Sequence, residues 1–194
     1  MIIGSISENK SLDQRIAITP DVAKKYKSLG LEIFLTKGYG QHLGISDDEF
    51  LKEGVNLKDN EDEIISKADL ILQLNILSDE KLEKLKQKQI LIGILNPYEN
   101  NEKLKLLIEK KIDCFSLELL PRITRAQSMD ILSSQANLAG YKAVVDSFSY
   151  FKKAIPMMMT AAGTISAARV LVVGAGVAGL QAIATAKRMG AIVF

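Results

Sequence analysis

Short apolar runs alternate with helix-like segments through the first 120 residues, and this alternation limits the possible folds more than any other feature. The apolar runs are typical of buried strands, and they read MIIGSI, LEIFLT, DLILQLN, QILIGIL and DCFSLE. The segment TPDVAKKYKSLG is typical of a helix, because Thr19 can cap its start and Gly30 can end it. Such alternation predicts an α/β fold, with a mainly parallel, Rossmann-like sheet and helices on both faces.

A glycine pattern later in the chain predicts a second unit. It matches G-x-G-x-x-G and consists of Gly174, Ala175, Gly176, Val177, Ala178 and Gly179. The strand-like run Val170–Val173 precedes it and a helix-like run follows, which is the context of a dinucleotide-binding turn. Gly174 permits the tight turn, Gly176 lets the backbone approach a pyrophosphate, and Gly179 allows close packing. The acidic residue that separates NAD from NADP is expected about 20 residues after the glycines, past Phe194.

A cluster of polar residues precedes this pattern. If the segment is helical, a spacing of three, four and three residues places four polar side chains on one stripe, and they are Gln127, Asp130, Ser134 and Asn137. Arg122 and Arg125 lie just before it, and arginine can hold a phosphate or carboxamide oxygen through two donors. The stripe fits a ligand-binding cleft and equally fits an ordinary amphipathic helix with a solvated side. The chemistry of the residues leaves both interpretations open.

A long helix is expected between the two regions. From Arg125 to about Phe151 the chain has no proline and only one glycine, and Pro156 marks the end of this stretch. We therefore predict three parts. They are an N-terminal α/β domain at 1–125, a linking helix and hinge at 126–160, and a truncated NAD-binding Rossmann domain at 161–194.

Composition excludes several other classes. The net charge of +2 gives no reason to expect nucleic-acid binding. The excess of basic residues after residue 113 suits an anionic ligand or an acidic partner. It is equally explained by a shortage of acidic residues in a buried, Ala-rich region. We expect Cys114 to be a buried inert thiol, and the single histidine, His42, has no second metal ligand nearby. The uncharged run Val170–Ala186 holds three fingerprint glycines, which favour a strand and turn over a membrane span.

Three stretches resemble a known family. PRITRAQSMDILSSQANLAGYKAV, PMMMTAAGT and GAGVAGLQAIATAKRMGA are similar to the NAD(H)-binding component of proton-translocating nicotinamide nucleotide transhydrogenases. That family shares its fold with alanine dehydrogenase. The resemblance implies that NAD is bound by the fingerprint and that its nicotinamide end is contacted by Arg122, Gln127, Asp130 and Ser133. It gives the catalytic, orienting roles to Gln127 and Asp130, and it favours Ser133 over the Ser134 of the polar stripe.

The resemblance also implies an activity and partners. The component would donate hydride from NADH to NADP⁺, and this transfer is coupled to proton translocation across the membrane. An NADP(H)-binding component and a membrane component would be its partners, and a homodimer is expected. The protein would then be cytoplasmic, held at the inner face of the cell membrane by its partner subunits.

Two alternatives remain at this stage. An alanine dehydrogenase-like enzyme is the first, and Arg15 matches its substrate-binding arginine. Its lysine and histidine positions hold Gln73 and Ile94, however, and deamination needs a general acid and base there. This difference counts against an amino-acid oxidoreductase. The second alternative is a non-catalytic oligomerisation fragment of the transhydrogenase that binds no nucleotide.

Overall fold

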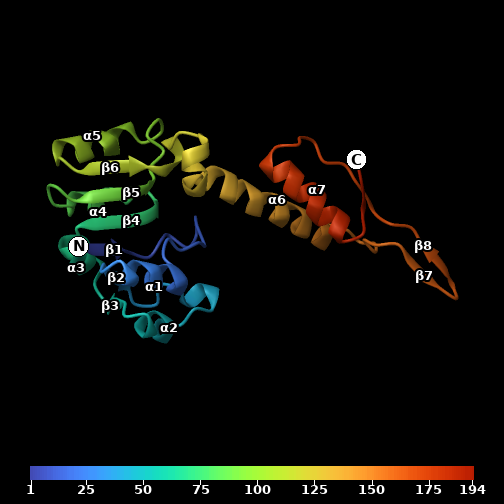
Figure 1. Cartoon of the computed structure of the whole chain (residues 1–194), viewed down its shortest axis with the longest axis horizontal. Helices are drawn as coiled ribbons and strands as arrows, with labels where there is room; N and C mark the ends of the chain where they lie inside the picture. The colour runs from blue at the N-terminus through green and yellow to red at the C-terminus, as the bar shows by residue number, and fades with distance from the viewer. The chain divides into compact units, whose positions relative to one another are not determined.

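The computed structural model describes all residues 1–194 and contains two compact units (Figure 1). The first unit is Met1–Pro121 and the second is Arg122–Phe194. The predicted α/β fold is confirmed, since strands and helices alternate through the first unit and a long helix precedes a strand–helix–strand segment in the second. The three-part division at residues 125 and 160 differs from this grouping, because the long helix and the glycine fingerprint belong to the same unit.

The first unit is built on a six-stranded parallel sheet. Its strands are β1 (Ile2–Ser5), β2 (Glu32–Thr36), β3 (Asn56–Lys58), β4 (Leu70–Asn75), β5 (Ile90–Ile94) and β6 (Asp113–Ser116). They lie in the order β3-β2-β1-β4-β5-β6, and each neighbouring pair is parallel. The order reverses between β1 and β4, so the carboxyl ends of these two strands form the topological switch point of the sheet.

Helices cover both faces of this sheet and bury a core on each. They are α1 (Pro20–Ser28), α2 (Asp47–Lys52), α3 (Glu61–Lys67), α4 (Asp79–Glu83) and α5 (Asn101–Glu109), with short 3₁₀ helices η1 (Gln41–Leu43) and η2 (Leu117–Leu119). One core packs Phe50 of α2 against Ile33 and Leu35 of β2. The other core includes Ile64 of α3 and Leu107 of α5. Each fully buried side chain of this size stabilises the fold by about 1.5–3 kcal/mol.

Local signals set several of these boundaries. Thr19 caps α1 by accepting a hydrogen bond from the amide of Val22, and Gly30 follows the helix with a φ of +77°. The charged run after Ser78 forms only a short helix, since α4 ends at Glu83. The expectation that Cys114 is buried is wrong. It lies on the edge strand β6, where no further strand covers it, and it is exposed.

The second unit begins with a 3₁₀ helix, η3 (Thr124–Met129), and the long helix α6 (Ile131–Tyr150). A hairpin of β7 (Met158–Thr160) and β8 (Gly163–Ile165) follows. The strand β9 (Arg169–Val170), the helix α7 (Val177–Arg188) and the strand β10 (Ile192–Val193) then form a parallel β–α–β segment. The helix that was expected after the glycine pattern begins within it, at Val177.

A small core joins α6 and α7, which lie side by side (Figure 1). Val144 of α6 and the alanines 182 and 186 of α7 are buried together, and Val170 and Val193 of the two strands pack against them. Alanines on α7 let the two helices approach closely, because a small side chain leaves little volume between the backbones. No helix anywhere in the chain combines the length and the apolar character that crossing a membrane would require.

Candidate functional site

The glycine fingerprint forms a turn that leads directly into α7. Gly174 has a φ of +105°, a conformation that favours glycine because it lacks a Cβ atom. A Cβ placed on Gly179 would overlap the carbonyl oxygen of Gly174 and lie 2.8 Å from its carbonyl carbon. Only glycine at position 179 therefore allows the helix to start so close to the turn. Two of the three roles predicted for the glycines thus have a geometric counterpart in the structure.

The N-terminus of α7 has free hydrogen-bond donors. Gly176 is the N-cap residue, and no side chain caps the helix. The first amides of a helix have no partner within it, and the helix dipole adds partial positive charge at the same end. Leu180 is the first residue whose amide donates back, to the carbonyl of Gly176 at 2.8 Å. The turn therefore presents the arrangement that holds phosphate groups in dinucleotide-binding proteins.

Three polar residues meet at the start of α6. Asp130 caps this helix and accepts hydrogen bonds from the amide of Ser133 at 2.9 Å and from its hydroxyl at 2.7 Å. The Nη2 of Arg122 donates to the Ser133 hydroxyl at 2.9 Å, and its Nε lies 3.5 Å from Asp130 Oδ2. We call these three residues the Arg122 cluster. The two hydrogen bonds from Ser133, followed by the charge of Arg122, hold the pKa of Asp130 below its usual range.

One open cavity of about 410 Å³ brings the Arg122 cluster and the fingerprint together. Its lining residues all belong to the second unit, and they are Arg122, Leu132, Ser133, Ala136, Val173, Gly174, Gly176, Val177, Ala178 and Gly179. Asp130 does not line the cavity itself but contacts two residues that do. A guanidinium group and uncapped amides thus face the same space, which suits an anionic ligand.

Other predicted site residues lie elsewhere. Gln127 is exposed in η3 and does not line the cavity, and Ala175 does not line it either. The polar stripe is wrong in its first half, because η3 ends at Met129 and Asp130 has a non-helical ψ of 87°. The hydroxyl of Ser134 donates to the carbonyl of Ile131 and leaves the site to Ser133. Sequence reasoning missed Leu132 and Ala136, which a helix starting at residue 131 would have placed beside Ser133.

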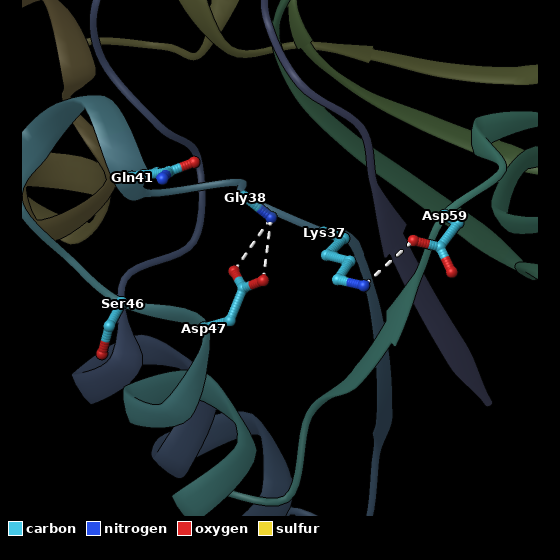
Figure 2. Close-up of a pocket in the computed structure, with 6 residues that line it drawn as sticks. All are labelled: Lys37, Gly38, Gln41, Ser46, Asp47 and Asp59. Carbon is cyan, nitrogen blue, oxygen red and sulfur yellow. Dashed lines mark hydrogen bonds and ion pairs between the residues drawn. The ribbon is translucent and has the colours of Figure 1, made fainter.

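Other cavities lie in the first unit. Figure 2 shows one of about 580 Å³ beside the carboxyl end of β2. Its charged groups already have partners within the protein. Asp47 accepts from the amide of Gly38 at 2.9 and 3.1 Å, and Lys37 Nζ lies 3.4 Å from Asp59 Oδ1. This pairing leaves little charge for a ligand, so the cavity is a weaker candidate.

Another cavity, of about 590 Å³, lies at the switch point of the sheet. Gln73 lines it but is 3% exposed, and its amide group is fully bonded. The side-chain oxygen of Gln73 accepts from Ser5 Oγ and the amide of Ile6, and its nitrogen donates to Glu8 Oε1 at 3.1 Å. This position therefore carries no titratable group for proton transfer. No three His, Cys, Asp or Glu side chains gather where they could hold a metal ion.

Comparison with known proteins places the chain in a family. The model of the alanine dehydrogenase/PNT N-terminal domain matches residues 4–139, and that of the corresponding C-terminal domain matches residues 143–194. The chain is 46% identical over its whole length to the first part of the NAD(P) transhydrogenase subunit alpha of Rickettsia prowazekii, and it covers 51% of that protein. It thus spans about half the length of the curated relatives that it matches.

Solved structures give the same answer. A transhydrogenase from Sinorhizobium meliloti is 44% identical, with a TM-score of 0.94 over the whole of this chain and 57% of that one. An L-alanine dehydrogenase has a TM-score of 0.82 over 98% of this chain and 53% of its own, at 17% identity, which shows a shared fold alone. On the family models that match both its parts, this chain belongs to the alanine dehydrogenase/PNT family.

Proposed function

We propose that this chain is the NAD(H)-binding part of a proton-translocating NAD(P) transhydrogenase. The observation that carries the proposal is the cavity in which the Arg122 cluster faces the glycine fingerprint. The 46% and 44% identity to transhydrogenase subunits supports the same activity. In this role the protein holds NADH while its hydride passes to NADP⁺ on another component.

The phosphate end of the dinucleotide would lie on the fingerprint. The uncapped amides at the start of α7 supply donors and partial positive charge to the pyrophosphate. The surface around Gly176 is open, and no atom lies within 4 Å of a Cβ built on it. A ligand backbone can therefore approach the loop there, which fits the role that glycine has at this position of the motif.

The nicotinamide end would lie toward the Arg122 cluster. Asp130 and Ser133 hold the guanidinium of Arg122 in place, and Arg122 would in turn hold the ring end of the ligand. Gln127 is the proposed partner of the carboxamide, since its exposed side chain is free to turn toward a bound ring. NADH itself supplies the hydride, so these residues only bind and orient it, and no acid or base step is assigned to them.

The partners follow from the same proposal. An NADP(H)-binding component and a membrane component would assemble with this chain, and two copies would form a homodimer. The chain would lie in the cytoplasm against the inner face of the membrane, held there by those components. The acceptor NADP⁺ must then approach the nicotinamide end of the cavity from a separate protein surface.

An NADH titration followed by the fluorescence of the nicotinamide tests this function. We expect saturable binding of NADH to the 194-residue chain. Replacing Arg122 with alanine should weaken NADH binding, since the guanidinium faces the cavity. No response up to millimolar NADH would contradict the proposal and would leave the chain as a non-catalytic fragment.

The alanine dehydrogenase alternative makes a different prediction. Its lysine position is the buried and fully bonded Gln73, and its histidine position is Ile94 in β5. Neither side chain can move a proton at the carbon that is oxidised. We therefore expect no NAD-dependent formation of pyruvate from alanine, measured by absorbance at high alanine concentration. A steady rise in NADH would favour the amino-acid oxidoreductase instead.

A further inference from the structure

We propose that Gly140 is a positioning residue for the dinucleotide site. It lets α6 lie against the first turn of α7, so that one rigid helix sets the separation between the fingerprint amides and the Arg122 cluster. The inference rests on the proposed function and deepens it, because it names a residue that touches no ligand but decides where the ligand-binding groups stand.

The contact at Gly140 leaves no room for a side chain. Gly140 is buried in the middle of α6. A Cβ built on it would overlap the carbonyl oxygen of Ala178 and lie 2.9 Å from its carbonyl carbon and 3.0 Å from its Cα. All three atoms are backbone atoms, so no flexible side chain can turn away to relieve the overlap. Any substitution at position 140 must therefore move α6 and the start of α7 apart.

Ala178 belongs to the part of α7 that would bind phosphate. It is the second residue of the helix, and it lines the cavity together with Val177 and Gly179. A displacement of its backbone carries the neighbouring amides with it, since they belong to the same helical turn. The overlap caused by a side chain at position 140 would therefore displace the turn of α7 that presents the free donors. Gly140 itself does not line the cavity.

The presence of glycine here opposes helix formation. Glycine in a helix interior is less favourable than alanine, because the unfolded backbone has more freedom to lose. Alanine at this position would therefore stabilise an isolated α6. Only glycine permits the close approach to α7. Alanine at position 140 should therefore favour the helix α6 itself but disfavour its packing against α7, and these two effects have opposite signs.

One face of α6 links the crossing to the Arg122 cluster. Ser133, Ala136, Gly140 and Val144 follow a helical spacing of three, four and four. Ser133 and Ala136 line the cavity, and Val144 packs in the core with Ala182 of α7. Beside them, Asn137 Nδ2 donates to Gln181 Oε1 at 3.4 Å. The helix that holds Ser133 is thus the same rigid element that seats α7.

The test compares Gly140→Ala with Ala182→Val in the 194-residue chain. Both add bulk to the α6–α7 interface, but Ala182 lies one turn farther from the fingerprint. We expect Gly140→Ala to raise the Kd for NADH about tenfold or more, and Ala182→Val to raise it less than about threefold. The urea midpoints of the two variants should fall by comparable amounts. The fluorescence of bound NADH should also change in Gly140→Ala, because the nicotinamide is misplaced.

Each outcome decides the question. If the wild-type chain binds NADH and Gly140→Ala binds it equally well, the proposal is overturned. It is also overturned if both variants lose affinity in proportion to their loss of stability, since Gly140 then has only a structural role. A wild-type chain that binds no NADH contradicts the proposed function, and this inference with it.

A measurement on the wild-type chain covers the case in which Gly140→Ala does not fold. Residues 138–144 of α6 do not line the cavity, and they include Gly140, which meets Ala178; Ala143 and Val144 line a separate apolar groove. If the contact couples this segment to the ligand-binding turn, saturating NADH should slow amide hydrogen exchange there. Unchanged exchange in the segment, with slowed exchange at Val177–Leu180, would overturn the proposal.

Discussion

At the scale of single residues, Asp130 combines two tasks. It caps α6 through the amide of Ser133, and it orders the Arg122 guanidinium by an ion pair and by the shared Ser133 hydroxyl. The first task needs only a hydrogen-bond acceptor, whereas the second depends on negative charge. A substitution that keeps the acceptor but removes the charge can therefore separate stability from positioning.

Asp130→Asn makes that separation. Asparagine caps a helix about as well as aspartate, so we expect the urea midpoint to stay close to that of the wild-type chain. In the proposed transhydrogenase, hydride transfer should fall about tenfold more than the affinity for NADH, because the charge would order the reacting end. Stopped-flow absorbance measures the transfer, and fluorescence titration measures the affinity.

Ser134→Ala is the matched control for Asp130→Asn. In the wild-type chain the Ser134 hydroxyl donates to the carbonyl of Ile131 and makes no hydrogen bond to the Arg122 cluster. Both the transfer rate and the affinity should stay at the wild-type values. Equal losses of rate and affinity in Asp130→Asn would contradict the orienting role and would indicate a uniform binding contact instead.

At the scale of elements, the start of α7 decides how the fingerprint works. A match to G-x-G-x-x-G predicts a turn and a helix, but the contact between Gly179 and the carbonyl of Gly174 shows why the third glycine is required. The same element has an uncapped N-terminus, so its donors remain available. The start of the helix is therefore available to the anionic ligand that the proposed function requires.

Gly179→Ala tests this element. The added methyl group overlaps backbone, so we expect a loss of stability of about 1–3 kcal/mol, as is usual for overpacking. The Kd for NADH should rise by about tenfold or more, because the turn and the first amides move apart. Urea unfolding and fluorescence titration measure the two effects.

Lys187→Ala serves as the control for Gly179→Ala, since Lys187 is exposed in the last turn of the same helix. It should change stability by less than about 0.5 kcal/mol and leave NADH binding unchanged. Wild-type affinity in Gly179→Ala would show that the start of α7 does not hold the dinucleotide.

At the scale of the whole molecule, the first unit has the properties of an independent domain. It has a complete six-stranded sheet with a buried core on each face, and Ile33, Ile71 and Leu91 are fully buried. Its 121 residues also exceed the roughly 40 residues below which domains need extra crosslinks. The strands and helices that cover both cores all come from within the unit.

Residues 1–121 should therefore fold without the rest of the chain. We expect cooperative urea unfolding of this fragment, followed by far-UV circular dichroism. Leu91→Ala in the fragment should lower its free energy of unfolding by about 2–5 kcal/mol, because the side chain is fully buried in the sheet. Leu12→Ala, at a position 84% exposed, should have little effect. A gradual transition without a midpoint would show that the unit depends on the second one.

The sequence by itself determined the class of fold and the identity of the fingerprint. Both depend on local patterns, such as apolar runs of strand length, helix caps like Thr19, and glycines at set intervals between a strand and a helix. The chemistry of the residues named Arg122 and Asp130 as candidates, whereas Ser133 came only from resemblance to a family. Local periodicity indicated Ser134 in place of Ser133, because it could not show that a 3₁₀ helix ends before Asp130.

The tertiary structure alone decided which residues meet. The strand order buries Gln73 at the switch point, α6 and α7 bring Ser133 to the fingerprint, and Gly140 meets the backbone of Ala178. These contacts join residues that are 38 or more positions apart along the chain, as Gly140 and Ala178 show. Such pairs leave no trace in a helical or strand period, because their position depends on how whole elements pack and not on the conformation of neighbouring residues.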